Sequence, residues 1–347
     1  MRANNNRHSG FTLVELMIAV VLGLLILASL TSFFVRTSYN RSELERNSQQ
    51  IENGRYAINA LRDDFMLAGF YADVTQPPSL TWTTPPACVT AVGSLGWVPG
   101  PLVPPTALQM AVPVFTYPDG VGRPTACTPD YQPGTDVVVV RRFNTEVTPL
   151  ANVVGPQVYV QISECATDNP ATPFIINTGS NVGTFVLHKK DCTTLADVWR
   201  YREQLYYVRS YSMIKADGFP DNIPVLVRVE LDSAATNAVP LVEGIEKLRV
   251  DFGIDTTSPG DGLPDVWKRC DLATPCTATE YANVMAVKVY VVSRNIDETR
   301  EYTDDKTYDL GLSGRTTAAM DHFKRHVYST LVGMPNRSGP RDPTPSS

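Results

Sequence analysis

Carboxylates that could bind a metal gather in one short stretch of the 347-residue chain. Asp255, Asp261 and Asp265 surround two glycines in a predicted loop that follows a strand-like run. Oxygen-rich loops of this kind bind calcium, although the spacing differs from that of an EF-hand loop and no glutamate closes it. The alternative is an Asp/Gly turn whose carboxylates accept hydrogen bonds from the loop's own backbone. Ca²⁺ at these three residues is therefore the one cofactor that we consider, and no other is expected.

Two histidines have the spacing of zinc ligands on a helix. His322 and His326 lie four residues apart, but the stretch HFKRH lacks the glutamate of an HExxH motif, which favours surface histidines. The sequence contains no GxSxG, P-loop or GxGxxG motif, and no cysteine has an evident catalytic setting. We therefore expect a protein that is not an enzyme.

The six cysteines all follow an apolar N-terminal segment, and none forms a CxxC pair. An even number of cysteines in a translocated domain predicts disulfides. Six cysteines permit 15 pairings, and free buried thiols are a further alternative. The simplest pairing joins sequence neighbours, each bond adding about 2 to 4 kcal/mol: Cys88 with Cys127, Cys165 with Cys192, and Cys270 with Cys276.

The apolar segment at residues 11–35 is long enough to cross a membrane. Its only ionisable side chain is Glu15, and Arg36 closes it. A helix over these residues is about 37 Å long. Because Arg2 and Arg7 precede the segment, the positive-inside rule keeps the N-terminus cytoplasmic and places the rest of the chain outside. The charge of Glu15 needs an explanation, since an acid costs about 2.5 to 3.5 kcal/mol near the bilayer centre.

The segment differs from a secretory signal, whose apolar core has about 7 to 15 residues and is followed by a small-residue cleavage site. Here the small residues Ser9 and Gly10 come before the core, where a cytoplasmic protease could cut ahead of Phe11. The alternative is a simple signal anchor, in which Glu15 is a chance charge that reaches the membrane surface.

The stretch GFTLVELMIAV resembles the class III leader of type IV prepilins and type II secretion pseudopilins. Gly10, Phe11 and Glu15 match that motif position by position. The resemblance implies that residues 1–10 are a leader, that prepilin peptidase cleaves after Gly10, and that Phe11 becomes N-methylated. It also implies that Glu15 meets the N-terminal ammonium of a neighbouring subunit in the filament. An unpartnered buried charge is strongly penalised, so Glu15 would fix the register of assembly.

A polar but helix-compatible stretch at residues 36–72 follows the apolar segment. It contains no proline, and only Gly54 and Gly69 weaken it. Apolar residues recur along one face and predict an amphipathic continuation that packs on a globular head: Leu44, Ile51, Ile58, Leu61, Phe65 and Ala68. We expect one helix from Phe11 to about Phe70, ended by Asp73 and the following prolines, with two helices separated near residues 36–42 as the alternative.

Residues 73–135 are rich in proline and predict an irregular connection, in which Trp82 and Trp97 could anchor an interface. Residues 136–335 predict a β-rich head, and residues 336–347 a flexible tail. The fold class is therefore α+β: a pilin-like long N-terminal helix, its first half transmembrane, packed on a mainly antiparallel sheet. Strands are predicted at residues 136–143, 157–163, 184–187, 204–210, 225–231, 247–253, 284–293 and 326–332.

The second half of the chain resembles the PilW family of minor type IV pilins. The resemblance rests on LVEGIEKLRVDFGIDTTSPGDGLPDVW, VMAVKVYVVSRN and the end HFKRHVYSTLVGMPNRS. It implies a single-pass protein of the bacterial inner membrane with an extracytoplasmic head. The protein would later become part of the pilus. The implied partners are prepilin peptidase, other minor pilins, the major pilin and a large tip adhesin. The implied role is to prime filament initiation or to sit in the tip complex.

Two other functions stay open. A minor pseudopilin of a type II secretion system shares the leader, the helix and the β-rich head. A membrane-anchored extracytoplasmic enzyme or receptor would keep its leader and never join a filament. Nucleic acid is not an expected partner, because 30 basic against 36 acidic residues give a net charge of −6 and no basic footprint.

Gly10→Val should block cleavage of the leader, because a β-branched residue cannot take the flexible conformations of glycine. The intact mass and the N-terminal residue of the protein recovered from cells measure this. The unaltered chain should begin with N-methyl-Phe11, and normal processing of the Gly10→Val variant would refute the leader assignment.

Overall fold

The computed structural model describes residues 12–74, 80–99, 108–168, 172–232, 235–317 and 319–339. Its chain forms two units, Met1–Gln49 and Gln50–Ser347. The second unit contains the β-rich head and the C-terminal part of the long helix, and its fold is described below by itself.

One continuous helix, α1 (Leu13–Leu67), replaces the alternative of two helices. It ends three residues before the predicted Phe70, so the prediction that Asp73 and the prolines end it is wrong. Gly69 follows the helix with a φ of +73°, and its N–H donates to the carbonyl of Arg141 at 3.0 Å. A glycine in this left-handed conformation is the usual stop for a helix, and the sequence carried that signal.

The predicted burial of the apolar stripe is confirmed at the C-terminal end of α1 and wrong at Leu44 and Ile51. Leu61, Phe65 and Ala68 are fully buried, whereas the side chain of Ile51 is 45% exposed and that of Leu44 is 69% exposed. The buried face carries the small or polar residues Gln50, Gly54, Ala57 and Asp64 in addition to the apolar Leu61 and Phe65. A search for large apolar side chains at seven-residue spacing does not find this buried face. Where the helix packs closely against the sheets, small residues take the buried positions.

A seven-stranded antiparallel sheet forms one wall of the head. Its order is β3-β4-β7-β5-β6, and β7 also pairs with β8, which pairs with β9. The long strand β7 bridges two parts of this sheet, since Arg200 pairs with β5 while Gln204–Arg209 pair with β8. The strands are β3 (Val114–Tyr117), β4 (Val137–Thr148), β5 (Val158–Ile162), β6 (Phe174–Thr178), β7 (Val198–Arg209), β8 (Val225–Asp232) and β9 (Ala235–Glu243).

A four-stranded antiparallel sheet of order β11-β10-β12-β15 forms the other wall. Its strands are β10 (Ile245–Ile254), β11 (Val266–Lys268), β12 (Val284–Arg294) and β15 (Arg325–Gly333). Two small sheets join β1 (Thr81–Thr83) to β2 (Gln109–Ala111) and β13 (Thr307–Asp309) to β14 (Arg315–Thr317). The short helices are α2 (Ala278–Ala282), α3 (Pro335–Ser338) and the 3₁₀ turns Val92–Ser94, Pro118–Gly120, Leu150–Asn152, Gly179–Thr184 and Gly311–Ser313.

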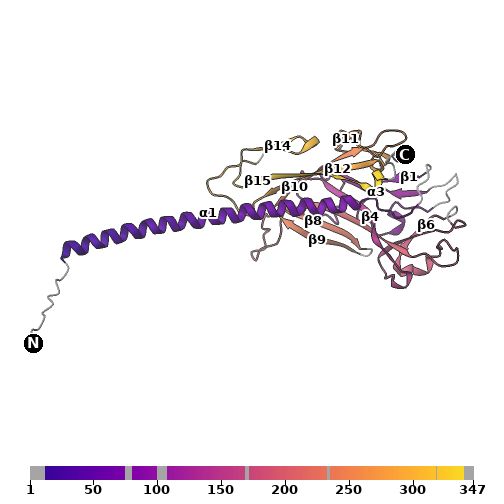
Figure 1. The fold of residues 1–347 in the computed structure, drawn as a ribbon, viewed down its shortest axis with the longest axis horizontal. Helices are drawn as coiled ribbons and strands as arrows, with labels where there is room; N and C mark the ends of the chain where they lie inside the picture. The colour runs from indigo at the N-terminus through magenta and orange to yellow at the C-terminus, as the bar shows by residue number, and fades with distance from the viewer. Residues whose placement is uncertain are drawn as a thin grey trace, which may run out of the picture. The chain divides into compact units, whose positions relative to one another are not determined.

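The C-terminal part of α1 packs between these two sheets, with β4, β8 and β9 on one side and β10, β12 and β15 on the other (Figure 1). Gln50 donates to the carbonyl of Ser293 in β12 at 2.8 Å. Asp64 faces the other sheet, where it pairs with Arg142 of β4 at 3.5 Å. The largest apolar cluster contains Ala57, Leu61 and Phe65 together with strand residues of both sheets. The helix and antiparallel sheets confirm the predicted α+β class.

Three sequence predictions about the head need correction. Residues 184–187 form no strand: Thr184 ends a 3₁₀ turn, and residues 185–187 have no regular structure. Residues 73–135 are not irregular throughout, because they contain β1 to β3, and Trp97 is 2% exposed in a core cluster. Its ring packs edge-on against Tyr71, with centroids 4.8 Å apart, so it is not a surface anchor. Residues 336–339 belong to an ordered end, while 340–347 lie outside the described residues.

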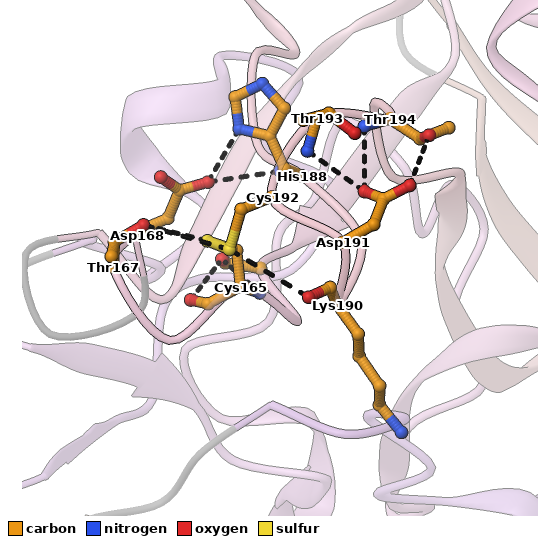
Figure 2. Close-up of a disulfide and its surroundings, with 10 residues drawn as sticks. Cys165, Thr167, Asp168, His188, Lys190, Asp191, Cys192, Thr193 and Thr194 are labelled. Atoms are coloured by element: carbon orange, nitrogen blue, oxygen red, sulfur yellow. Dashed lines mark hydrogen bonds and ion pairs between the residues drawn. A yellow bond between two sulfur atoms is a disulfide. The ribbon is translucent and has the colours of Figure 1, made fainter.

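Three disulfides link the cysteines in the pairs of sequence neighbours, at separations of 39, 27 and 6 residues. Figure 2 shows Cys165–Cys192, next to which Asp168 pairs with the Nδ1 atom of His188 at 2.9 Å. Asp191 lies beside the same bond and accepts the N–H groups of the two threonines that follow Cys192. These local cross-links close loops around the sheets, where the unfolded chain would otherwise have most freedom.

Gly54→Ala should destabilise the head by about 1 to 3 kcal/mol, the usual cost of overpacking. A Cβ at this position would lie 2.1 Å from the Tyr328 ring. The opposite sign is expected from helix propensity alone, which favours alanine by about 1 kcal/mol. Denaturant unfolding of the detergent-solubilised chain measures the change, with Gly23→Ala as control because nothing lies within 4 Å of that position. Adding Tyr328→Ala should restore stability, and a stabilised single variant would contradict this packing.

Candidate functional site

The N-terminal part of α1 exposes a continuous apolar surface. Its most apolar 18-residue window has a mean hydropathy of 2.7, and none of that window is buried. Large apolar side chains between Leu13 and Val35 are 53% to 74% exposed. A helix that is apolar all round requires lipid or neighbouring helices around it. Among the described residues, α1 is the one helix long and apolar enough to cross a membrane.

Glu15 lies in the first turn of this helix and caps its N-terminus. Its Oε2 atom accepts the backbone N–H of Thr12 at 2.9 Å and the Thr12 hydroxyl at 2.8 Å. In return, the N–H of Glu15 donates to the Thr12 hydroxyl at 3.2 Å. This reciprocal pair is a capping box, which satisfies N–H groups that a helix start leaves unpaired.

The capping box adds Thr12 to the site, a residue that the sequence analysis missed although Thr-Leu-Val-Glu before an apolar run carries its signature. The cap gives the carboxylate a partner within its own chain. A carboxylate has about four acceptor sites, so the bonds to Thr12 leave capacity for an ammonium group. Gly10 and Phe11 lie outside the described residues, and their cleavage and methylation stay predictions.

Polar side chains fix α1 at one end of the head. Besides its bond to Ser293, the Gln50 amide donates to the carbonyl of Lys324 at 2.9 Å, and the Ser293 hydroxyl donates to the Gln50 carbonyl at 3.2 Å. Asn53, about one turn further along, donates to the carbonyl of Glu243 at 3.1 Å. The acceptors are backbone carbonyls at or next to strand ends. These bonds therefore fix the position of residues 50–53 along the direction of the strands.

A buried acid holds the docked helix segment near its C-terminal end. Asp64 is 8% exposed and accepts the hydroxyl of Tyr206, besides its ion pair with Arg142. Burial, together with the negative charge of Asp64, raises the pKa of Tyr206 well above its usual value. The tyrosine therefore stays a neutral donor to the carboxylate, which a buried acid requires.

The C-terminal end of α1 is fixed by the segment that follows β15. Arg337 is 5% exposed, and its guanidinium donates twice to the carbonyl of Ala282, at 3.1 and 2.6 Å. It also lies 4.7 Å from the centroid of the Trp82 ring, a cation–π contact. The Asn336 amide donates to the carbonyl of Met66 at 3.2 Å. Because Gly69 has no side chain, the stem of Arg337 can pass beside the helix end.

The carboxylates proposed for calcium are used by their own loop. Asp255 accepts the N–H groups of Thr257 at 3.1 Å and Gly262 at 3.0 Å. Asp265 accepts the N–H of Thr256, and Asp261 that of Leu263. In the described part of the chain, no group of three or more histidine, cysteine or acidic side chains is placed to hold a metal. The arrangement is that of the Asp/Gly turn alternative, and calcium binding stays a prediction.

The two histidines of HFKRH lie in different settings. The Nδ1 atom of His322 is hydrogen-bonded to the carbonyl of Tyr302. His326 lies within β15, where its ring centroid is 4.7 Å from that of Tyr328. His322 precedes β15, so the two histidines do not lie on one helix, which is the setting that their spacing suggested for zinc.

Two family models match parts of the chain. Residues 205–336 match the family Type IV Pilus-assembly protein W, and residues 5–31 match the prokaryotic N-terminal methylation motif. The resemblance to the PilW family is confirmed. The PilW match runs from β7 to Asn336 and so covers the whole four-stranded sheet. Both matches concern pilus assembly and leader processing, and the leader match with the apolar helix fits membrane anchoring with an extracellular head.

A structural comparison finds a type IV-like pilin from Thermus thermophilus, with 13% sequence identity and a TM-score of 0.29. The alignment covers 60% of this chain and 81% of that pilin. No curated protein matches the chain in sequence.

Arg337→Lys should destabilise the head by about 1.5 to 3 kcal/mol, the typical value of hydrogen bonds to a charged group. Lysine cannot both donate a fork of two bonds and stack on Trp82. Denaturant unfolding should show a lower midpoint than for Arg315→Lys, which changes an exposed arginine. Equal midpoints for the two variants would show that Arg337 does not fix the end of α1.

Proposed function

We propose that this protein is a minor pilin that takes part in type IV pilus assembly, priming filament initiation, sitting in the tip complex, or both. The observation that supports it most is the combination in one chain of a methylation motif, an exposed membrane-length helix and a PilW-type head. Because both matched families concern pilus assembly and leader processing, we propose a structural role rather than an enzymatic one.

The proposed sequence of events begins in the inner membrane. The leader at residues 1–10 is cut after Gly10 by prepilin peptidase, and Phe11 is methylated. The apolar helix then waits in lipid with the head outside the cytoplasm. Other minor pilins, and later the major pilin, replace lipid around this helix, so that a preformed cluster lowers the cost of starting a filament. A large adhesin is the expected partner of the head at the tip.

Glu15 is proposed to recognise the N-terminal ammonium of a neighbouring subunit. The capping box supports this role, because it keeps the carboxylate at the first turn of the helix, close to where the cleaved terminus of an adjacent chain would lie. An ammonium donates up to three hydrogen bonds, which a carboxylate can accept while Thr12 remains bound. Assembly would then neutralise a charge that lipid disfavours.

A minor pseudopilin of a type II secretion system remains the second candidate, since the leader motif serves both systems. The PilW match over residues 205–336 favours the pilus. Deletion of the gene should remove surface pili and leave secretion of exoproteins intact. Loss of secretion with normal pili would assign the chain to the secretion system.

Glu15→Gln should be cleaved normally but reduce surface pili by about ten-fold or more, because breaking a buried ion pair costs about 3 to 5 kcal/mol. Glutamine keeps an oxygen that can accept from Thr12 and loses the charge. The matched variant Thr12→Val keeps the charge and weakens the cap, at about 1 kcal/mol, and should assemble. Sheared filaments, quantified by immunoblot, give the result. Wild-type piliation by Glu15→Gln would reduce Glu15 to a capping residue.

A further inference from the structure

One face of the four-stranded sheet is turned away from the core and carries a pocket of about 410 Å³. Phe252 of β10 and Val289 of β12 belong to the apolar cluster that also contains residues of α1. Since side chains alternate between the two faces of a strand, Asp251 and Lys288 lie on the other face, where both line the pocket. Its volume is within the range of sites that bind small ligands.

An aromatic wall of this pocket depends on a glycine. Trp267 of β11 is paired with Gly253 of β10, which is two residues from Asp251 and so shares its face. A Cβ at Gly253 would lie 3.0 Å from the Trp267 ring, so the ring lies over β10 where no side chain stands. The indole thus comes to line the same pocket as the carboxylate.

The turn between β13 and β14 forms another wall. Leu310 is buried in a cluster with Tyr290 of β12, which holds the turn on the sheet. The N–H of Leu312 donates to the Oδ2 atom of Asp251 at 3.0 Å. Gly311 has a φ of +68°, and a Cβ there would collide with the Asp251 carboxylate and the Tyr290 hydroxyl. The backbone of the turn therefore comes as close to the carboxylate as a glycine permits.

The carboxylate of Asp251 is only partly satisfied. The residue is 2% exposed, yet its Oδ1 atom has no hydrogen-bond partner within the part of the chain that the structure describes. Lys288 is directly opposite in the register of β10 and β12, but its amine lies 5.6 Å from the centroid of the Tyr290 ring and is not bonded to Oδ1. Burial raises the pKa of Asp251, and the charge of Lys288 offsets only part of this effect.

The lining selects the chemistry of a ligand. A cation would be repelled by Lys288, and an anion by Asp251. A neutral molecule that both donates and accepts hydrogen bonds suits the two side chains together. Sugar hydroxyls do both, and the C–H face of a pyranose packs on aromatic and apolar side chains such as Trp267. Leu312 and Leu331, which are 54% and 62% exposed, leave the pocket open to an incoming chain of sugars.

We propose that this pocket binds one pyranose ring of a glycan. One hydroxyl donates to Oδ1 of Asp251, another accepts from the amine of Lys288, and a face of the ring packs on Trp267. The hydrogen bond to Oδ1 removes the penalty of a buried acceptor without a partner. The pocket is built from the head alone, so the inference depends neither on membrane insertion of α1 nor on entry into a filament.

The test uses the full-length chain, labelled with 5-fluorotryptophan and solubilised in a detergent without a sugar headgroup. The chain has four tryptophans, and Trp267→Phe assigns the fluorine NMR signal of the pocket. Chitotriose represents the glycan of a cell wall, and methyl galactoside and methyl mannoside represent surface glycans. Each is added to about 50 mM, well above a Kd of about 1 mM. At least one sugar should shift the Trp267 signal and leave that of the buried Trp97 in place, and the active sugar identifies the source.

Asp251→Asn should weaken this binding about ten-fold or more. The amide oxygen keeps the bond from Leu312, which turns a donor toward the pocket where the ligand needs an acceptor. The midpoint of unfolding should not fall, because the variant removes a desolvated charge. A residue with a purely structural role would lower the midpoint and leave binding unchanged. Asp305→Asn, at an exposed position, is the matched control for net charge and should bind as the unaltered chain does.

Lys288→Met keeps an apolar stem at an exposed position and should also weaken binding about ten-fold. It provides a second measurement that does not depend on the stability of Asp251→Asn. The inference is overturned when no sugar shifts the Trp267 signal, or when both variants bind as the unaltered chain does. A shift caused by lysine methyl ester and by none of the sugars would assign the pocket to a basic side chain of a protein partner, and would overturn it as well.

Discussion

The insertion of one helix segment between two sheets is the constraint on which the rest of the head depends. Neither sheet can close its apolar face on the other where residues 50–68 lie, so both faces need the helix as their shared third layer. Gly54 allows this, because without a side chain it lets the helix backbone lie close to Tyr328 of β15. The polar bonds of Gln50 and Asn53 fix the start of this docked segment against the strands.

Buried charges organise the regions that apolar packing leaves irregular. Arg141 is fully buried and pairs with Glu203 at 2.7 Å, across neighbouring strands. The free ends of this pair reach the proline-rich segment, since Arg141 donates to the Pro85 carbonyl and Glu203 accepts the N–H of Cys88. Removing one partner would leave a desolvated charge, a strong penalty. A segment with few regular hydrogen bonds is thus held by an ion pair and a disulfide.

The sequence was sufficient for elements that carry a local signal. The apolar segment, the strand VMAVKVYVVS and the class III motif each depend on neighbouring residues, and α1 and β12 lie where these predict. The burial of Trp97 and Arg337 could not be predicted in this way. Trp97 stands among prolines and glycines, and its burial depends on Tyr71 and Phe143 from other elements. For Arg337, the decisive partner is a carbonyl 55 residues away.

The docking of α1 has a consequence for the order of events during folding. Its contacts with Lys324 and Asn336 join residues 274 and 270 positions apart in sequence. Such non-local contacts form late, because a long stretch of chain must close first. Because synthesis runs from the N-terminus to the C-terminus, residues 50–67 of the helix lack these partners until β15 and the Arg337 segment have been made. A product truncated before them would carry the apolar segment without a closed head, and the open head would be cleaved by proteases more readily than the complete one.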